Sequence, residues 1–251
     1  MAKEILIAVH RAGNCKFQPN SLAAIHECWM KGHIPEVDIQ LTQDKIAVLA
    51  HDDSIERICQ GSPKLIISAL TYSELMNHPL CSGDGLKHTI PKLEEIFKQM
   101  KLSANRLVLL DLKNDFAYAS VFALANRYEV SEQIHFLAPS KEIAQVIRNS
   151  LPKSKIHLRF TKFSKAFKSN SKESCIDSFL YFPQNGLVDD VIEHPTDSSL
   201  SYFCELARSN GKKCGVVMLD QKIDEKVVRA LKKAGVTLFL VGNSESLTNN
   251  S

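Results

Sequence analysis

The chain has 251 residues, of which 44% are hydrophobic and 24% are charged, with a formal net charge of +3 at pH 7. This composition excludes an intrinsically disordered chain, a collagen-like repeat and a coiled coil. No apolar run approaches the ~18 residues of a membrane-spanning helix, and the first residues lack the layout of a signal peptide, so we expect a cytoplasmic protein without stable membrane insertion.

Short, nearly continuous apolar runs alternate with longer helix-like stretches along the chain. Such runs are typical of parallel strands that helices cover on the outside. Eight runs are predicted as strands: Glu4–Val9, Glu36–Thr42, Arg106–Lys113, Ile134–Ala138, Lys155–Phe160, Ser178–Phe182, Cys214–Leu219 and Leu238–Val241. Eight β/α repeats in this length favour a single α/β domain over residues 1–251, a TIM (β/α)₈ barrel, rather than an open doubly wound sheet.

Helices are predicted between the strands from their start and stop signals. Asn20 or Ser21 can cap a helix over Leu22–Lys31, which ends at Gly32. The same signals predict further helices over Phe116–Tyr128, Lys141–Asn149, Ser198–Asn210 and Asp224–Ala234.

One stretch interrupts the alternation after the second predicted barrel strand. A short strand at Ala47–Ala50 is followed by an insertion of about residues 52–105. Because this is too long for one βα loop, it must contain extra helices, which we predict at Thr71–Asn77 and Leu93–Lys101. An insertion at this end of a barrel strand overhangs the active face, where it could form a lid or a substrate-selecting wall.

The positive charge is concentrated in one segment. Residues 153–172 contain seven Lys and Arg and no acidic residue, leaving 24 Lys and Arg against 28 Asp and Glu elsewhere. A nucleic-acid-binding protein usually spreads its positive charge along a face with aromatic side chains. We therefore expect no nucleic-acid partner and interpret the segment as a solvated face. A phosphate-steering role stays open for one or two of its lysines, and Lys162 is the one placed just beyond a strand.

Seven cysteines are scattered along the chain without a C-x-x-C pair. A disulfide framework would be dense and contain an even number of cysteines. We therefore expect reduced thiols that are mostly buried.

Polar residues at the ends of the first strands are the candidates for chemistry. Glu36 and Asp38 are two residues apart on one strand, so both carboxylates point to the same face. Two bare carboxylates on an inward face would repel each other unless a cation neutralises them, and a hard divalent ion with oxygen ligands is the obvious compensation. Asp111 and Lys113 alternate in the same way and could add a third carboxylate and a fixed positive charge.

Each of these residues alone also has a purely structural explanation, such as a hydrogen-bonded histidine or an ion pair at the barrel mouth. Their convergence points to chemistry, because His10-Arg11 ends the first strand and His51 follows the short strand. Two histidines, three carboxylates, an arginine and a lysine are the parts needed for metal-assisted phosphoryl transfer. The positive groups would neutralise the phosphate, and two imidazoles would serve as general base and general acid.

The order of these residues resembles that of the glycerophosphodiester phosphodiesterase family. The matching motifs are His10-Arg11, Asn20-Ser21, Glu36 with Asp38, Thr42-Gln43-Asp44, His51-Asp52, Arg57, Pro91-Lys92-Leu93-Glu94-Glu95 and Asp111-Leu112-Lys113. The motif resemblance covers about residues 4–113 and is only architectural beyond them. It implies a TIM barrel with a small subdomain inserted after the second barrel strand.

The resemblance also implies roles for residues and a substrate. His10 and His51 would be the acid-base pair, and one divalent cation, Mg²⁺ or Ca²⁺, would be held by Glu36, Asp38 and Asp111. The phosphate would be contacted by Arg11 and Lys113. The partner would be a small-molecule glycerophosphodiester, hydrolysed to glycerol 3-phosphate and an alcohol, and in several relatives a hydroxyl of the substrate itself is the first nucleophile. No signal in the sequence specifies an oligomeric state.

The sequence also departs from the family pattern. Gln18-Pro19 replaces the family's Pro-Glu, Ala12 replaces a glycine, and Asp111 replaces a glutamate. Two late motifs are altered as well, and stand here as Val217-Met218-Leu219-Asp220 and Val241-Gly242-Asn243-Ser244. These changes keep two alternatives open. One is a phospholipase C- or D-like hydrolase of intact lipids, and the other is a non-catalytic barrel that binds a phosphoester.

Overall fold

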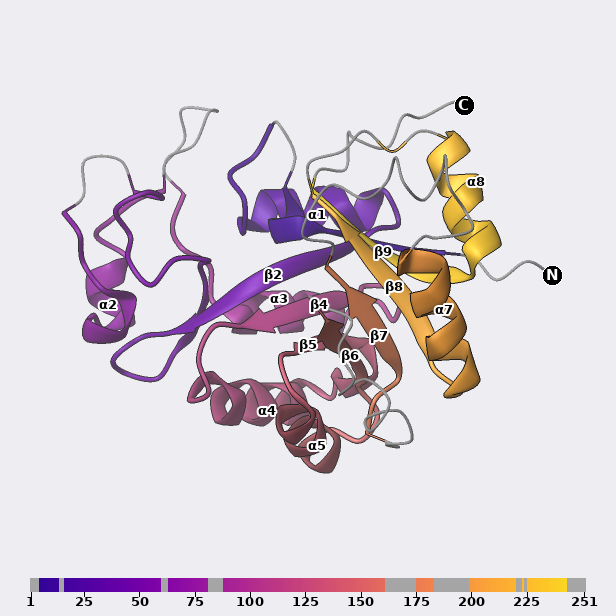
Figure 1. Ribbon diagram of the computed structural model, residues 1–251. Helices are drawn as coiled ribbons and strands as arrows, with labels where there is room; N and C mark the ends of the chain where they lie inside the picture. Colours follow the sequence, from indigo (N-terminus) through magenta and orange to yellow (C-terminus); the bar gives the residue numbers. More distant parts are fainter. Residues whose placement is uncertain are drawn as a thin grey trace.

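The computed structural model is a closed barrel of eight parallel strands surrounded by helices (Figure 1). It describes residues 5–13, 16–59, 63–80, 88–160, 175–182, 199–219, 223 and 225–242. The barrel strands are β1 (Leu6–Val9), β2 (Ile34–Leu41), β4 (Val108–Leu112), β5 (Ile134–Ala138), β6 (Lys155–Phe160), β7 (Ser178–Tyr181), β8 (Lys213–Met218) and β9 (Val236–Val241). Each pairs in parallel with the next, and β1 closes the ring by pairing with both β2 and β9. The predicted TIM barrel is confirmed.

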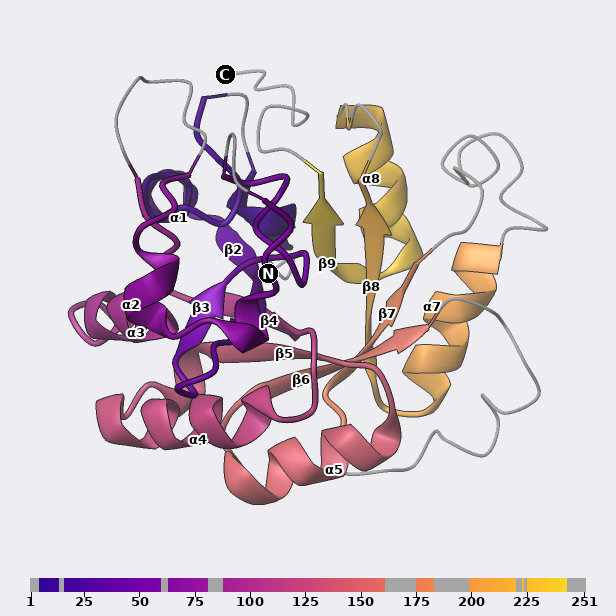
Figure 2. The same ribbon diagram turned by 90° about the vertical axis from the view of Figure 1, so that its left-hand side faces the viewer.

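The helices lie outside this ring. They are α1 (Leu22–Met30), α3 (Leu93–Met100), α4 (Ala117–Tyr128), α5 (Lys141–Ser150), α7 (Ser199–Ser209) and α8 (Glu225–Ala234). Ser21 caps α1 by accepting a hydrogen bond from Ala24 N, and Gly32 follows the helix with φ of +71°, a conformation that favours glycine. Figures 1 and 2 both place α4 beside α5 along one side of the barrel. None of the helices in the described ranges has the length and hydrophobicity needed to cross a membrane.

Apolar side chains fill both the interior of the barrel and the layer between strands and helices. The interior contains an alternating inward set, from Ala8 on β1 through Leu109 and Leu180 to Leu240 on β9. The larger outer layer contains the opposite face of each strand together with the helix residues, including Phe97, Phe136 and Phe203. Because both faces of each strand are buried, the strands are almost continuously apolar in sequence. Polar residues on the inward face therefore stand out.

A separate hydrophobic cluster follows β2. Strand β3 (Ala47–Leu49) folds back antiparallel on the end of β2, and described apolar residues between Val48 and Ile90 pack together, among them Ile55, Ile67 and Leu75. This segment contains the short elements η2 (Ile67–Ala69) and α2 (Tyr72–Leu75). Helix α3, predicted as part of the insertion, packs with Leu93, Ile96 and Phe97 in the layer between the barrel strands and the surrounding helices.

The described cysteines are buried, as expected, and none of them forms a disulfide with another described cysteine: Cys28, Cys59, Cys175, Cys204 and Cys214. Cys204 on α7 and Cys214 on β8 lie with their Sγ atoms 2.7 Å apart, at the contact between this helix and the barrel. Cys15 and Cys81 lie outside the described residues.

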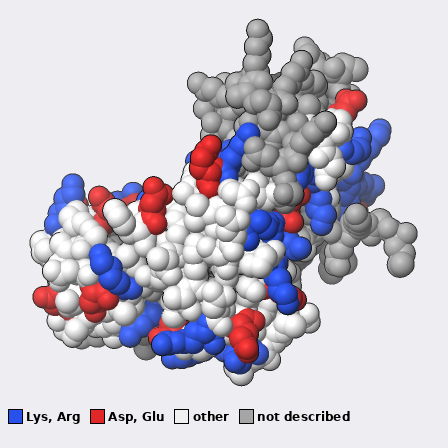
Figure 3. All heavy atoms as spheres, turned by 90° about the horizontal axis from the view of Figure 1, so that it is seen from below, with Lys and Arg blue, Asp and Glu red and all other residues white. Residues whose placement is uncertain are grey.

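Surface charges of both signs are interspersed on the face that carries α4 and α5 (Figure 3). Several of the charges form ion pairs, such as Lys101 with Glu129 and Lys153 with Glu132. Most of the basic segment 153–172 lies outside the described residues, including Lys162.

Two histidines are buried inside the barrel near the start of its strands. His135 Nδ1 is 2.8 Å from His157 Nε2, and the pair is 6% and 5% exposed. Burial lowers the pKa of His157 to about 3 and that of His135 well below the ordinary value of 6.5. Both imidazoles are therefore neutral at physiological pH.

This pair should make the fold sensitive to acid. An unfolded chain takes up protons on these imidazoles as the pH falls below about 6.5, whereas the folded chain does not until the pH approaches 3. The free energy of unfolding should therefore be undiminished by this pair above pH 6.5 and fall progressively below it. Replacing His135→Gln should flatten this decrease, as measured by urea unfolding between pH 7.5 and 4. His26→Gln, at an exposed site, is the control and should lose stability with acid as the wild type does. If His135→Gln loses stability as steeply as these two proteins, the acid sensitivity does not come from the buried histidine pair.

Candidate active site

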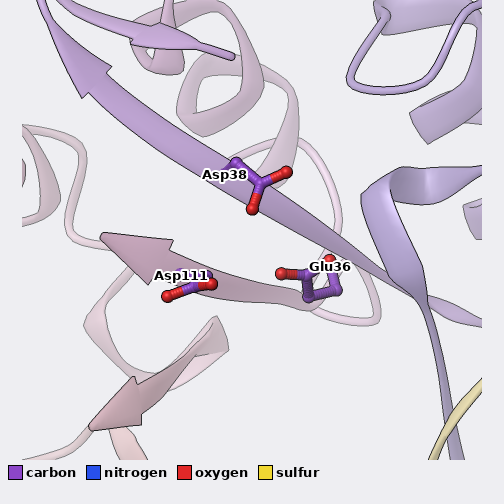
Figure 4. A group of neighbouring side chains, drawn as sticks. All are labelled: Glu36, Asp38 and Asp111. Carbon is purple, nitrogen blue, oxygen red and sulfur yellow. The ribbon is translucent and has the colours of Figure 1, made fainter. Parts of the chain in front are cut away.

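Three carboxylates meet at the carboxyl end of the barrel strands. Glu36 and Asp38 project from the same side of β2, and Asp111 lies on the neighbouring strand β4, directly opposite Asp38 in the register (Figure 4). One oxygen from each carboxylate lies within 4.8 Å of the others. Glu36 and Asp38 are 1% and 0% exposed. The period of two in a strand, combined with parallel pairing, produces this convergence.

The donor set fits a hard divalent cation. Carboxylate oxygens are the ligands that Mg²⁺ and Ca²⁺ prefer in proteins. Burial, and next to it the charge of Asp38, raises the pKa of Glu36 well above its ordinary value. In addition, the buried Asp38 Oδ1 accepts no hydrogen bond of good geometry from the described part of the chain. A bound cation would stabilise the charged form of Glu36 and would add a ligand contact to Asp38 Oδ1, whose neighbour within the chain is the ammonium group of Lys113.

Two positive side chains share these acids. Lys113 Nζ lies 2.7 Å from Asp38 Oδ1 and 2.6 Å from Asp111 Oδ2, while Arg11 Nε is 3.5 Å from Asp38 Oδ2. Burial opposes the positive charge on Lys113, but the two carboxylates outweigh it and raise the pKa of the ammonium above its ordinary value. Lys113 is therefore charged at neutral pH and faces the centre of the cluster.

The turn after β1 is held in an unusual backbone conformation. Arg11 and Ala12, within the short helix η1 (His10–Ala12), have φ of 53° and 51°. A side chain is unfavourable in this left-handed region, and Ala12 stands where the resembling family has a glycine. The conformation aims the Arg11 backbone N–H at Glu36 Oε2, to which it donates a 2.7 Å hydrogen bond. The turn thus contributes a backbone donor to the acidic cluster.

Asn20 clamps Asp38, a role that the sequence did not reveal. Its Nδ2 donates to Asp38 Oδ2 at 2.9 Å, and its Oδ1 accepts from Asp38 N at 3.1 Å. Asn20 is 5% exposed, has φ of 60°, and donates its backbone N–H to Arg11 O at 2.7 Å. We expected Asn20 or Ser21 as a helix cap, and Ser21 takes that place. The sequence contained one signal for this conformation, an asparagine directly before the helix cap, because asparagine tolerates a left-handed backbone better than most residues do.

The two histidines have different surroundings. Burial, followed by the charge of Arg11, lowers the pKa of His10 to about 4, so its imidazole is neutral. His51 Nδ1 lies 2.7 Å from Asp52 Oδ1, and Asp52 Oδ2 lies 3.4 Å from Arg57 Nη1. The hydrogen bond with His51 lowers the pKa of Asp52, which keeps this carboxylate charged. The charge of His51 also contributes to the low pKa of His10.

The segment around His51 is tied to β2. Gln40, on the same face of the strand as Glu36 and Asp38, donates from Nε2 to His51 O at 3.4 Å and accepts at Oε1 from Asn114 Nδ2 at 3.3 Å. A cavity of about 130 Å³ lies beside His51. Its wall includes Arg11, Gln18, Asn20, Arg57, Ile58 and Leu80. The structure thus gathers all the predicted site residues at one end of the barrel apart from Lys162, which lies outside the described residues.

Known proteins share this sequence pattern. The chain is 31% identical over 133 residues to the human (Homo sapiens) protein named glycerophosphodiester phosphodiesterase 1, and 30% identical over 132 residues to the protein of the same name from Mus musculus. Each match covers 50% of this chain and 39% of the relative, so the chain spans well under half of the relatives' length.

Solved structures share the fold. A glycerophosphodiester phosphodiesterase from Agrobacterium tumefaciens superposes with a TM-score of 0.75 at 17% identity, over 96% of this chain and 98% of that one. A phosphodiesterase from Oleispira antarctica, in complex with the product sn-glycerol-3-phosphate, superposes with a TM-score of 0.68 at 16% identity, over 94% and 92% of the two chains. At these identities the likeness concerns the fold.

The sequence profile described as the glycerophosphoryl diester phosphodiesterase family matches residues 10–243, almost the whole barrel. The match begins at His10, the first residue of the candidate site, and spans every described residue of that site. The match therefore extends over both halves of the chain, and the chain belongs to the glycerophosphoryl diester phosphodiesterase family.

Proposed function

We propose that the chain hydrolyses glycerophosphodiesters to glycerol 3-phosphate and an alcohol, with one divalent cation and a histidine pair. The observation that carries this proposal is the buried cluster of Glu36, Asp38 and Asp111, with Lys113 and Arg11 in contact with it. Family membership and the glycerol 3-phosphate complex of the Oleispira relative support the substrate class. A site that only binds phosphate would need positively charged groups but no pair of histidines for proton transfer, so the two histidines favour an enzyme.

The residues that would hold the cation are Glu36, Asp38 and Asp111, and Mg²⁺ or Ca²⁺ suits their oxygen ligands. When bound, such an ion withdraws negative charge from phosphate oxygens and so favours attack at phosphorus. The side chains of Arg11 and Lys113 would donate to the same oxygens, because both already face the cluster with a fixed positive charge. Lys162 remains a proposed contributor to phosphate steering from outside the described residues.

The two imidazoles would divide the proton transfers. His10 is neutral, so it can accept the proton of the attacking hydroxyl group, which belongs either to water or to the substrate itself. His51 is backed by the Asp52 carboxylate, which fixes the ring and compensates a positive charge on it. His51 can therefore give its proton to the oxygen of the departing alcohol. After both transfers His10 is protonated and His51 is neutral, so His10 must lose a proton to water and His51 must regain one before the next turnover.

The first test is hydrolysis with and without the cation. Glycerophosphocholine and glycerophosphoethanolamine should release glycerol 3-phosphate, EDTA should abolish the release, and Mg²⁺ or Ca²⁺ should restore it. Glu36→Gln should lower the affinity for the cation, as measured by calorimetric titration. Glu27→Gln, on the surface of α1, is the matched control. Release of a headgroup from intact phospholipid vesicles alone would favour the phospholipase-like alternative. Binding of the diesters without any cation-dependent product would favour the non-catalytic barrel.

The second prediction concerns the histidines. His10→Ala and His51→Ala should each lower kcat by ~10²–10⁴-fold, because each removes one proton-transfer group. Circular dichroism and the thermal midpoint should show an intact fold. His26→Ala, on the exposed face of α1, is the control for loss of an imidazole, and turnover at the wild-type rate in either site variant would exclude the proposed role of that residue.

The third prediction concerns the clamp on Asp38. Asn20→Gly should weaken cation binding by about 10–100-fold, because it removes a group that orients a ligand. Glycine tolerates φ of 60°, so this variant separates the lost amide from backbone strain, whereas Asn20→Ala adds that strain. Calorimetric titration of Mg²⁺ and Ca²⁺ measures the effect. Wild-type affinity in Asn20→Gly would show that Asp38 needs no such clamp.

A further inference from the structure

A second cavity lies at the opposite end of the barrel from the carboxylate cluster. It has a volume of about 460 Å³, within the range of small-molecule sites. Its wall includes residues at the start of successive strands: His135 on β5, Lys155 and His157 on β6, Ser178 on β7 and Lys213 on β8. The candidate active site lies where the strands end, so the two sites share no residues.

A chain of hydrogen bonds leads into this cavity. His157 Nδ1 pairs with Ser178 Oγ, and His157 Nε2 pairs with His135 Nδ1 at 2.8 Å. These contacts use both ring nitrogens of His157 and one of His135. The other ring nitrogen of His135, Nε2, takes no part in these hydrogen bonds, and this histidine is 6% exposed and lines the cavity. A neutral imidazole in this position can donate a hydrogen bond to a ligand or accept one from it, because the tautomers of the two hydrogen-bonded histidines can change together.

The charges around the cavity are unbalanced. Its two acids are already engaged, Glu132 with Lys153 at 2.6 Å and Asp177 with Arg148 at 2.5 Å. The ammonium groups of Lys155 and Lys213 form no ion pair with a carboxylate in the described ranges, and both side chains are exposed. Two uncommitted positive charges therefore stand at the rim, above a partly buried hydrogen-bonding group.

The remainder of the wall is apolar. Leu6 on β1, Leu107 just before β4 and Leu238 on β9 face the cavity, and apolar atoms make up most of its surface. Leu6 is 38% exposed, so part of this apolar side chain is open to solvent at the cavity. A ligand that fits both parts of this cavity has an anionic group and a hydrocarbon body.

We propose that this cavity is a second ligand site, which binds a small anionic amphiphile. The anionic group would lie between Lys155 and Lys213, within reach of His135, and the hydrocarbon part would cover Leu6, Leu107 and Leu238. A carboxylate and a phosphate monoester share this chemistry. The site is separate from the proposed phosphodiesterase site and does not depend on its activity.

The test uses octanoate and octyl phosphate as probes. Octanol, which has the hydrocarbon part alone, and inorganic phosphate, which has the anionic part alone, are the controls. NMR spectra of the histidine rings in the full-length chain should show saturable shifts of His135 and His157 with at least one of the two anionic amphiphiles. Octanol and phosphate should bind at least about tenfold more weakly, because each lacks one part of the recognition. The stronger of the two anionic probes identifies the headgroup.

The variant K155Q/K213Q should reduce that affinity by about tenfold or more. K232Q/K233Q, which removes two charges from the exposed face of α8, is the matched control and should bind as the wild type does. A single substitution, Leu107→Phe, should obstruct the cavity while leaving both lysines in place. The proposal is overturned if neither anionic probe shifts the ring signals, if octanol binds as tightly as octanoate, or if K155Q/K213Q retains wild-type affinity.

Discussion

The constraint on which the carboxyl end of the barrel depends is the burial of three carboxyl groups in one place. Glu36 and Asp38 have almost no exposure to solvent, and Asp111 lies directly beside them. Burying a charge without a partner costs several kcal/mol, so the cluster can persist only where positive charge is supplied to it. Lys113 and Arg11 supply part of it from within the chain. A divalent cation and the phosphate it attracts complete the balance in the function we propose.

The backbone around this cluster carries the cost of arranging it. Arg11, Ala12 and Asn20 all adopt left-handed conformations, which are unfavourable for arginine and alanine and tolerated by asparagine. In return, a backbone N–H reaches Glu36 and an amide reaches Asp38. Strain of this kind concentrates at functional sites, because only a well-packed surrounding structure can enforce it. The buried anchors of this turn, Ala12 and Asn20, are consistent with that requirement.

The features that the sequence predicted are those set by local geometry. Alternation within a strand placed Glu36 with Asp38 and Asp111 with Lys113, and apolar runs between helix caps located the barrel strands. The clamp by Asn20 escaped prediction because it depends on a left-handed backbone and on a partner 18 residues away. The packing of α3 against the barrel escaped as well, because an amphipathic helix does not reveal which of two neighbouring cores it covers. Both missing features were decided by tertiary contacts.

Inward-facing polar side chains are stabilised in different ways at the two ends of the barrel. At the carboxyl end, ion pairs satisfy the buried polar groups, as between Lys113 Nζ and Asp38 Oδ1, which lie 2.7 Å apart. At the amino end, burial keeps His135 and His157 neutral, and hydrogen bonds rather than ion pairs satisfy most of their nitrogens. The register of β5, β6 and β7 decides this arrangement, because it sets His157 beside Ser178. A barrel interior of this kind can therefore hold an ion-dependent site at one end and a neutral polar site at the other. The interior also contains apolar side chains, including those of Leu109, Leu137 and Leu180.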